Sequence, residues 1–302
     1  KVSDIHELYY ATYGNPKGIP VVLLHGGPGA GFHETSTKVF NPEKYYVIGF
    51  DQRGALRSKP FASLEENTTQ HLRDDIEKLR KHLQIDKWLV FGGSWGSALA
   101  ILYGQTYPER CLGFILRGIN LLREDDIDHL LYGMGKIFPD AYAPVIDLIP
   151  EKERSDLFTA YYKRVISSDP TIALEAARTF VKYDIICGTH LPDPERVSKL
   201  LQNEKLVLGM SKLFLHYSIN NFFLPENHIL SQIHSISHLP CTIIHGRWDA
   251  ICLPVMAHSL HKAWPGSTLW IVTQGGHAGN DPAITRSLAT ATDLFISQNC
   301  SI

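Results

Sequence analysis

The side chain best placed for chemistry is Ser94, which stands among glycines in FGGSWGSALA, residues 91–100. An apolar run precedes it and helix-forming residues follow, so the segment predicts a strand that turns sharply into a helix, with the serine at the turn. Gly92 and Gly96 would permit the strained backbone of a nucleophile elbow, which exposes the hydroxyl at the top of a sheet. The alternative is a glycine-rich structural turn with an idle serine, so partner residues must decide.

A serine hydroxyl is a weak nucleophile at neutral pH and needs a base, together with a third group that orients the base. Asp249 follows the apolar run CTIIHGRW, and His277 follows STLWIVTQGG, so both are expected on loops just past the carboxyl ends of strands. Among 15 histidines a single one is weak support, and Asp249 could simply cap a helix or a turn. The chain order Ser94, Asp249, His277 is nevertheless that of an α/β-hydrolase triad, and we predict one.

Two backbone N–H groups are predicted to stabilise the oxyanion that forms during acyl transfer. The N–H of Trp95 would lie at the N-terminus of the helix after Ser94. The N–H of Gly27 would project from the loop LLHGGPGAG, which Pro28 stiffens. A phosphate-binding role for this loop is excluded because the Lys-Ser/Thr pair of a P-loop is missing.

The elements that must position these residues are short apolar runs punctuated by glycine, alternating with helical stretches. The runs are four to six residues long and alternate little, which favours strands buried on both faces of an open, mainly parallel α/β sheet. A helix is expected with Thr68 or Thr69 as its N-cap, and a final amphipathic helix begins at Asp281 and Pro282. The apolar runs are PVVLLHGG, YYVIGFDQRG, KWLVFGG, CLGFILRG, CTIIHGRWD and STLWIVTQGGH.

This alternation fails across residues 121–235, where helical patches with many aromatic and charged residues replace the strands. We therefore expect an α/β-hydrolase core in residues 1–120 and 236–302, with a helical cap in residues 121–235 inserted after the sixth strand. Three helical patches are expected in the cap, within residues 153–165, 170–183 and 195–217. A cap at this position would cover the ends of the strands and enclose the site.

Composition excludes several classes of protein. The 302 residues are 20% charged with a formal net charge of −2, which gives no electrostatic case for binding nucleic acid or an anionic membrane. The apolar stretches are far shorter than the roughly 20 residues of a membrane helix. The first residue is Lys1 rather than Met, which suggests trimming or a removed leader.

The five cysteines are odd in number, form no CxxC pair and have no metal-ligand spacing. They predict free, mostly buried thiols in a reducing compartment, and we expect a cytoplasmic protein. A cysteine nucleophile is disfavoured because no cysteine occupies a turn like that of Ser94. The cysteines are Cys111, Cys187, Cys241, Cys252 and Cys300.

The motifs together closely resemble those of the proline iminopeptidases, in order over nearly the whole chain. They are HGGPG, FDQRG, NTT, FGGSWGS, YPER, LRG, HGRWD and GGH. The resemblance implies an α/β-hydrolase core with a helical cap, no metal or other cofactor, and removal of N-terminal proline from peptides. It also implies Ser94, Asp249 and His277 as nucleophile, acid and base. DQRGALRS departs from the family, which usually has a small residue and glycine between its glycine and arginine.

The cap departs from the family where the substrate's amine would bind. The family holds this amine with two glutamates. Here Asp184, placed by its distance from LPDP at residues 191–194, replaces one, and Phe214 in KLFLHYSINNFF replaces the other. Phe180 and Tyr183 are also expected to contact the substrate. Losing one charge-assisted hydrogen bond predicts about a 10- to 100-fold penalty for an ammonium substrate.

Two alternatives qualify this interpretation of the cap: Glu175 or Asp147 could supply the missing carboxylate, or the correspondence through the cap could be misaligned. Three functions stay open. They are an aminopeptidase for N-terminal proline or a similar small residue, a related hydrolase that cleaves an ester, thioester or amide without a free amine, and a non-enzymatic binding protein. The sequence indicates a small peptide or acyl compound as partner, and determines neither its identity nor the oligomeric state.

Overall fold

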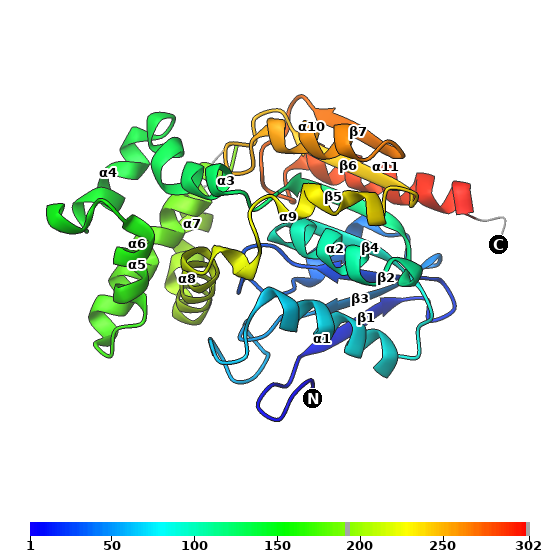
Figure 1. Cartoon of the computed structure of the whole chain (residues 1–302), viewed down its shortest axis with the longest axis horizontal. Coiled ribbons are helices and arrows are strands. Elements are labelled where there is room, and N and C mark those ends of the chain that lie inside the picture. Colours follow the sequence, from blue (N-terminus) through cyan, green and yellow to red (C-terminus); the bar gives the residue numbers. More distant parts are fainter. Residues whose placement is uncertain (191–193, 300–302) are drawn as a thin grey trace.

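The computed structural model describes residues 1–190 and 194–299, so Cys300 and three residues of the LPDP motif lie outside the described part. Its centre is a sheet of seven strands in the order β1-β3-β2-β4-β5-β6-β7 (Figure 1). β1 runs antiparallel to β3, and every other pairing is parallel, which confirms the mainly parallel α/β fold. The strands are β1 Tyr10–Gly14, β2 Ile19–Leu24, β3 Tyr45–Phe50, β4 Trp88–Ser94, β5 Cys111–Ile119, β6 Cys241–Gly246 and β7 Ser267–Val272.

The central strands are buried on both faces because their apolar side chains alternate between two hydrophobic cores. On β2, Val22 and Leu24 join the core on one face and Val21 and Leu23 the core on the other. β7 differs from this expectation, since it is an edge strand with mostly half-buried side chains. The opposite edge strand β1 was not predicted, because its segment YATYG carries no apolar run and is exposed.

Helices cover both faces of the sheet. α1 (Thr69–His82), α2 (Trp95–Thr106) and α10 (Pro254–Ala263) pack on one face, while the 3₁₀ helix η1 (Glu34–Val39) and α11 (Pro282–Asn299) pack on the other. The predicted cap of α1 is confirmed, since the Thr68 side chain accepts a hydrogen bond from the N–H of His71. Helices on both faces leave the carboxyl ends of the strands as the edge where a site can form.

The segment between β5 and β6 is helical, and most of it, residues 124–219, lies to one side of the sheet, at the left of Figure 1, whereas its last helix, α9, packs beside α2. Five strands precede it rather than the expected six; ahead of β1, residues 1–9 contribute only one isolated bridge, between Glu7 and Lys59. The expected run at residues 195–217 divides into two helices at Asn203, whose side chain caps the second. The α-helices here are α3 Glu124–Asp128, α4 Pro139–Asp147, α5 Leu157–Val165, α6 Pro170–Gly188, α7 Pro194–Gln202, α8 Glu204–Ile219 and α9 His228–Ser231.

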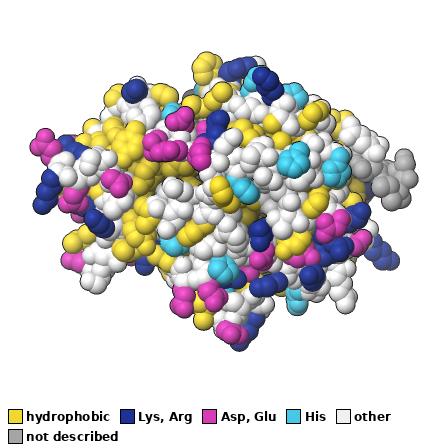
Figure 2. Space-filling view, in the orientation of Figure 1, with side chains coloured by type: hydrophobic (Ala, Val, Ile, Leu, Met, Phe, Trp, Pro, Cys, Tyr) yellow, Lys and Arg dark blue, Asp and Glu magenta, His cyan; other side chains and the backbone are white. Residues whose placement is uncertain are grey.

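Figure 2 shows hydrophobic side chains gathered over the inserted helices, with charged side chains around them and over the rest of the visible face. Exposed hydrophobic residues of the inserted segment include Tyr132, Ile137, Ile166 and Ile172. Of the helices within residues 1–190 and 194–299, none combines the length and the apolar character that crossing a membrane requires.

Candidate active site

Ser94 lies at the turn between β4 and α2 with φ 57° and ψ −128°, a conformation that is strained for a non-glycine residue. Its neighbours explain the glycines. A Cβ on Gly92 would lie 2.1 Å from the carbonyl oxygen of Gly96, and one on Gly96 would lie 2.1 Å from that of Leu24. Only glycine allows the strand, the turn and the neighbouring β2 to approach this closely, so the turn can point the Ser94 hydroxyl outward.

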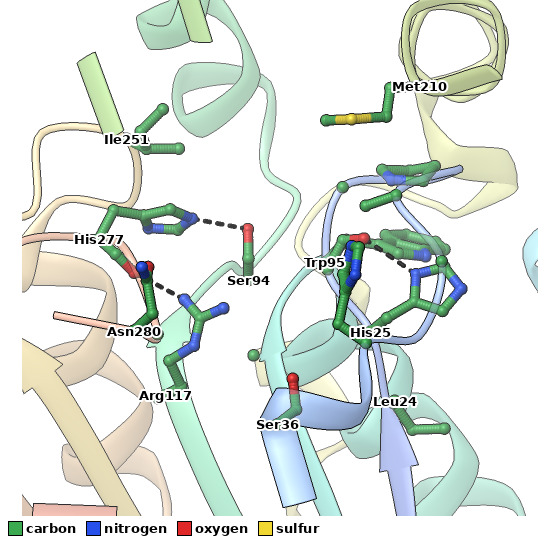
Figure 3. Close-up of a pocket in the computed structure, with 18 of the residues that line it drawn as sticks. Leu24, His25, Ser36, Ser94, Trp95, Arg117, Met210, Ile251, His277 and Asn280 are labelled. Carbon is green, nitrogen blue, oxygen red and sulfur yellow. Dashed lines mark hydrogen bonds between the residues drawn. The ribbon is translucent and has the colours of Figure 1, made fainter. Parts of the chain in front are cut away.

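The structure brings the three predicted residues together. Ser94 Oγ lies 3.0 Å from His277 Nε2 (Figure 3). On the other side of the ring, His277 Nδ1 lies 3.0 and 2.9 Å from the two carboxylate oxygens of Asp249. With its proton on Nδ1, His277 donates to Asp249 and accepts from the serine hydroxyl. This arrangement can transfer the serine proton to the imidazole.

Asp249 is only 2% exposed and is held by several donors. The N–H groups of Ile251 and Cys252 donate to its Oδ1 at 3.1 and 2.8 Å. Burial alone would raise the pKa of the Asp249 carboxyl, but the interaction and hydrogen bond with His277, together with the hydrogen bond from Cys252, outweigh burial and lower it. The carboxylate is therefore ionised and fixed in orientation toward His277.

The loop after β2 lies directly against the Ser94 turn. A Cβ on Gly26 would lie 3.1 Å from the Cβ of Ser94, and Gly27, with φ 39°, lines the same cavity. Trp95 begins α2, so its backbone N–H has no acceptor within that helix. The predicted pair, Gly27 and Trp95, thus flanks the serine.

A buried network ties this loop to the serine turn. The indole of Trp95 donates to Gln52 Oε1 at 2.8 Å, and the Gln52 amide donates to the carbonyl of His25 at 3.0 Å. The His25 ring accepts from the N–H of Gln52 at 3.0 Å and donates to the carbonyl of Gly26. Burial lowers the pKa of His25 to about 4, so the ring is neutral and its tautomer is fixed.

Arg117 is a site residue whose position was not predicted. Its Nη1 donates to the backbone carbonyl of His277 at 2.7 Å. Its guanidinium fits between Gly93 and Gly279, where a Cβ would lie 2.5 and 2.9 Å from its Nε, and burial lowers its pKa. Only the LRG motif pointed to it, because its partner carbonyl is 160 residues away in the chain.

A cavity of about 670 Å³ surrounds Ser94 and reaches under the inserted helices. Phe180, Asp184 and Phe214 line it as expected. The rings of Phe180 and Phe214 pack with centroids 5.4 Å apart. Tyr183 is not among the lining residues, since it is buried beside Tyr142 with ring centroids 5.8 Å apart.

Asp184 is the only acidic residue among the described residues that line this cavity, and burial raises the pKa of its carboxyl. The two residues that could have supplied the missing carboxylate, Glu175 and Asp147, are exposed and do not line the cavity. Within residues 1–190 and 194–299, no group of three or more His, Cys, Asp or Glu side chains could hold a metal ion. The part of the cavity under the inserted helices thus has aromatic side chains and a single carboxyl group.

The chain is similar to known proteins over nearly its whole length. A family model described as the alpha/beta hydrolase fold matches residues 19–282. A proline iminopeptidase of Arabidopsis thaliana is 46% identical over 296 residues, which cover 97% of this chain and 78% of the relative. A probable proline iminopeptidase of Leptolyngbya boryana is 45% identical over 98% of this chain and 93% of its own. This chain belongs to the proline iminopeptidase family of α/β-hydrolases.

Family membership confirms the resemblance in the motifs and makes the protein an enzyme, a serine hydrolase of the proline iminopeptidase type. The non-enzymatic alternative is therefore set aside. The crystal structure of a proline iminopeptidase from Mycobacterium smegmatis matches with a TM-score of 0.67 at 16% identity, covering 100% of this chain and 98% of that one. At that identity the structural similarity supports the fold alone.

Proposed function

We propose that the protein hydrolyses the amide bond after an N-terminal proline or a similar small residue, with Ser94 as nucleophile, His277 as base and Asp249 as orienting acid. The observation that carries this proposal is the hydrogen-bonded chain from Ser94 through His277 to Asp249 at the wall of a cavity that also holds Asp184. The family relatives named proline iminopeptidases support the substrate class.

In the proposed reaction, Ser94 Oγ attacks the carbonyl carbon of the scissile bond while its proton passes to His277 Nε2. The negative charge that develops on the carbonyl oxygen is stabilised by the N–H groups of Trp95 and Gly27. His277 then gives the proton to the leaving nitrogen, the C–N bond breaks and an acyl-enzyme forms. Water, deprotonated by His277, hydrolyses the ester, releases the amino acid and restores Ser94.

We further propose that residues 121–235 form a cap domain that encloses the acyl group. Phe180 and Phe214 would pack against the ring of a prolyl group, and Asp184 would accept a hydrogen bond from its ammonium. Tyr183 has no direct part, because its side chain is buried away from the cavity.

A specific observation favours a second candidate, an acyl substrate that lacks a free amine. Where the family is expected to place a glutamate, Phe214 contributes to an aromatic cluster, with its ring 5.4 Å from Phe180 and 6.3 Å from Phe222. An ammonium entering this cavity exchanges water for one carboxyl group. An ester, thioester or uncharged amide pays no such desolvation penalty.

The cysteines, the cavity and the net charge bear on the compartment and the partners of the protein. Cys111, Cys187, Cys241 and Cys252 are free and buried, which supports a reducing compartment, and we propose the cytoplasm. The partner would be a small peptide or acyl compound that fits the cavity. The formal net charge of −2 offers no attraction to nucleic acid.

A pair of isosteric substrates separates the two candidates. Prolyl anilide and cyclopentanecarbonyl anilide have nearly the same shape, and only the first carries an ammonium. If the amine is recognised, the wild type should prefer the prolyl compound in kcat/KM, and Asp184→Asn should remove that preference. Glu175→Gln, which changes an exposed carboxylate on the same helix, is the matched control and should change nothing.

The variant Phe214→Glu tests the missing carboxylate. We expect its kcat/KM for prolyl anilide to rise by up to about 10- to 100-fold, the worth of one charge-assisted hydrogen bond, with no gain for the cyclopentane analogue. If the wild type cleaves the analogue as fast as the prolyl compound, recognition of the amine is refuted and the second candidate is supported. Efficient proline release by the wild type with no gain in Phe214→Glu would show that Asp184 suffices.

A further inference from the structure

The cavity extends on both sides of Ser94 (Figure 3). Met210 and Ile251 line it on the side of the inserted helices, whereas Ser36 and Leu24 lie on the opposite side of the serine. The first side is the acyl pocket described above. The second side is not needed to hold a prolyl group.

We call this second part the leaving-group arm and define it by Ser36, Lys38, Val39, Asn280, Thr285 and Leu288. It lies between η1 and the beginning of α11, two elements that pack together on one face of the sheet. Val39 and Leu288 are buried, whereas Ser36 and Lys38 are exposed. The arm therefore has an apolar inner wall and a polar mouth that opens to solvent away from the inserted helices.

The stereochemistry of acyl transfer determines which part of a substrate faces this arm. In the tetrahedral intermediate the oxyanion points to the N–H groups of Gly27 and Trp95, and the acyl group points into the acyl pocket. The leaving nitrogen must face His277, because His277 Nε2 gives it a proton. Gly279 and Asn280, which follow His277 in the chain, line the cavity at the entrance of the arm.

Arg117 fixes the place where the loop that carries His277 meets the entrance of the leaving-group arm. Its guanidinium is held between Gly93 and Gly279 and donates to the carbonyl of His277, so the loop that carries the base and the entrance of the arm are positioned together. A peptide chain that leaves the scissile nitrogen would pass beside this guanidinium toward Ser36 and Lys38.

We propose that the leaving-group arm binds the residues that follow the scissile bond, so that the enzyme prefers peptides of three or more residues to dipeptides or simple amides. This proposal rests on the proposed function, in which Ser94 and His277 cleave an acyl bond. An extended chain advances about 3.3 Å per residue, so two leaving residues add roughly 7 Å of chain beyond the scissile bond. The open mouth sets no upper limit on length, and Lys38 favours a free C-terminal carboxylate.

The first test is a series of substrates with a constant prolyl group and a growing leaving group: the methyl ester, the simple amide, Pro-Ala, Pro-Ala-Ala and Pro-Ala-Ala-Ala. In the wild type, kcat/KM should rise by about fivefold or more from the dipeptide to the tripeptide, because remote binding contributes to the transition state. A flat series from dipeptide to tetrapeptide would overturn the proposal.

The second test fills the arm. In Ser36→Trp, the ratio of kcat/KM for Pro-Ala-Ala to that for the methyl ester should fall by about tenfold, since the indole occupies the leaving peptide's path. Glu34→Trp is the matched control, because Glu34 is exposed on the same 3₁₀ helix and outside the cavity lining, and its ratio should equal that of the wild type. Equal ratios in all three proteins would overturn the proposal.

Charge reversal gives a readout that does not depend on steric bulk. Lys38→Glu should lower kcat/KM for Pro-Ala-Ala with a free carboxylate about threefold or more relative to its C-terminal amide. An unchanged ratio of acid to amide would remove Lys38 from the proposal.

A failure of the proposed function can be told apart from a failure of the leaving-group arm. If the wild type accepts the cyclopentanecarbonyl group but not the prolyl group, the same leaving groups are joined to the cyclopentanecarbonyl group. The length dependence and the ratio of Ser36→Trp to Glu34→Trp then test the arm on the acyl group that the enzyme accepts.

Discussion

At the scale of single residues, Ser94 holds a strained backbone conformation that its own side chain does nothing to relieve. Its hydroxyl hydrogen bond is to His277, a partner across the cavity rather than within the turn. The conformation is enforced by the close packing of Gly92 and Gly96. Packing of the turn and chemistry of the hydroxyl should therefore be separable by mutation.

We predict that Ser94→Ala abolishes turnover while leaving the free energy of unfolding nearly unchanged. The Ser94 side chain lines the cavity and contributes little packing. Steady-state kinetics and urea denaturation followed by circular dichroism measure these two properties, and labelling by a serine-directed phosphonate should also be lost. Near wild-type turnover in a preparation free of other hydrolases would refute the assignment of the nucleophile.

Asp249→Asn should lower kcat by about 10⁴-fold, the loss seen when the equivalent change in a serine protease favours the wrong histidine tautomer. The asparagine can still accept from the N–H groups of Ile251 and Cys252, so the loop should keep its geometry. Single-turnover measurement of acylation isolates the step concerned. A loss below tenfold would indicate another acid.

At the scale of elements, glycines differ in whether they have room for a side chain, and those in the turn between β4 and α2 have none. Gly92→Ala should destabilise the fold by at least about 3 kcal/mol, because its Cβ would lie 2.1 Å from a backbone oxygen that cannot move freely.

The control is Gly188→Ala, in α6. A Cβ there meets Ile251 at an ordinary 3.5 Å, and the free energy of unfolding should change by less than about 1 kcal/mol. Urea denaturation of both variants compares them. If the two variants are equally stable, the turn at Ser94 can shift further to accommodate a Cβ than its packing indicates.

The predictability of these elements differs for physical reasons. Ser94, Asp249 and His277 could be located because each follows an apolar strand and the sheet gathers strand ends at one edge. Tyr183 was misplaced because neighbouring residues on a helix point about 100° apart. Asp184 lies on the cavity side with Phe180, four residues before it, and Tyr183 does not. The helix breaks at Asn203 although its sequence reads as one helical run, because the asparagine side chain competes for the backbone as a cap.

Two features depend on distant contacts that no local pattern records. Arg117 gains its position from the carbonyl of His277, 160 residues later. The leaving-group arm forms between η1 and α11, whose sequences show only a short turn and an amphipathic helix. Motifs thus predicted residues that the fold brings together, whereas the shape of the cavity had to come from the tertiary structure.

At the scale of the whole molecule, buried histidines couple stability to acidity. His25 has its pKa lowered by burial to about 4, and burial also lowers the pKa of His216 and His245. In the unfolded chain these rings take up protons near pH 6.5, whereas the folded protein binds fewer protons in this range. The unfolded state is therefore favoured as the pH falls.

We predict that the free energy of unfolding decreases from pH 6.5 to pH 4, with His25 alone contributing about 3 kcal/mol of the loss at pH 4. Urea denaturation at half-unit pH intervals measures the slope. His25→Gln keeps an acceptor for the N–H of Gln52 and should flatten the curve, although it lowers stability at pH 7. A wild-type curve that is level over this interval would contradict the prediction.

The distance in sequence between the reacting groups also bears on biosynthesis. Ser94 is made 183 residues before His277, and at about 5–20 residues per second a ribosome needs on the order of 10–40 s to add them. The last helix docks through Thr292, which accepts from Tyr45 Oη and donates to the carbonyl of Val39. A nascent chain therefore carries its serine for many seconds with no base beside it. Hydrolytic competence appears only after the loop that carries His277 has folded onto the strands that were made first.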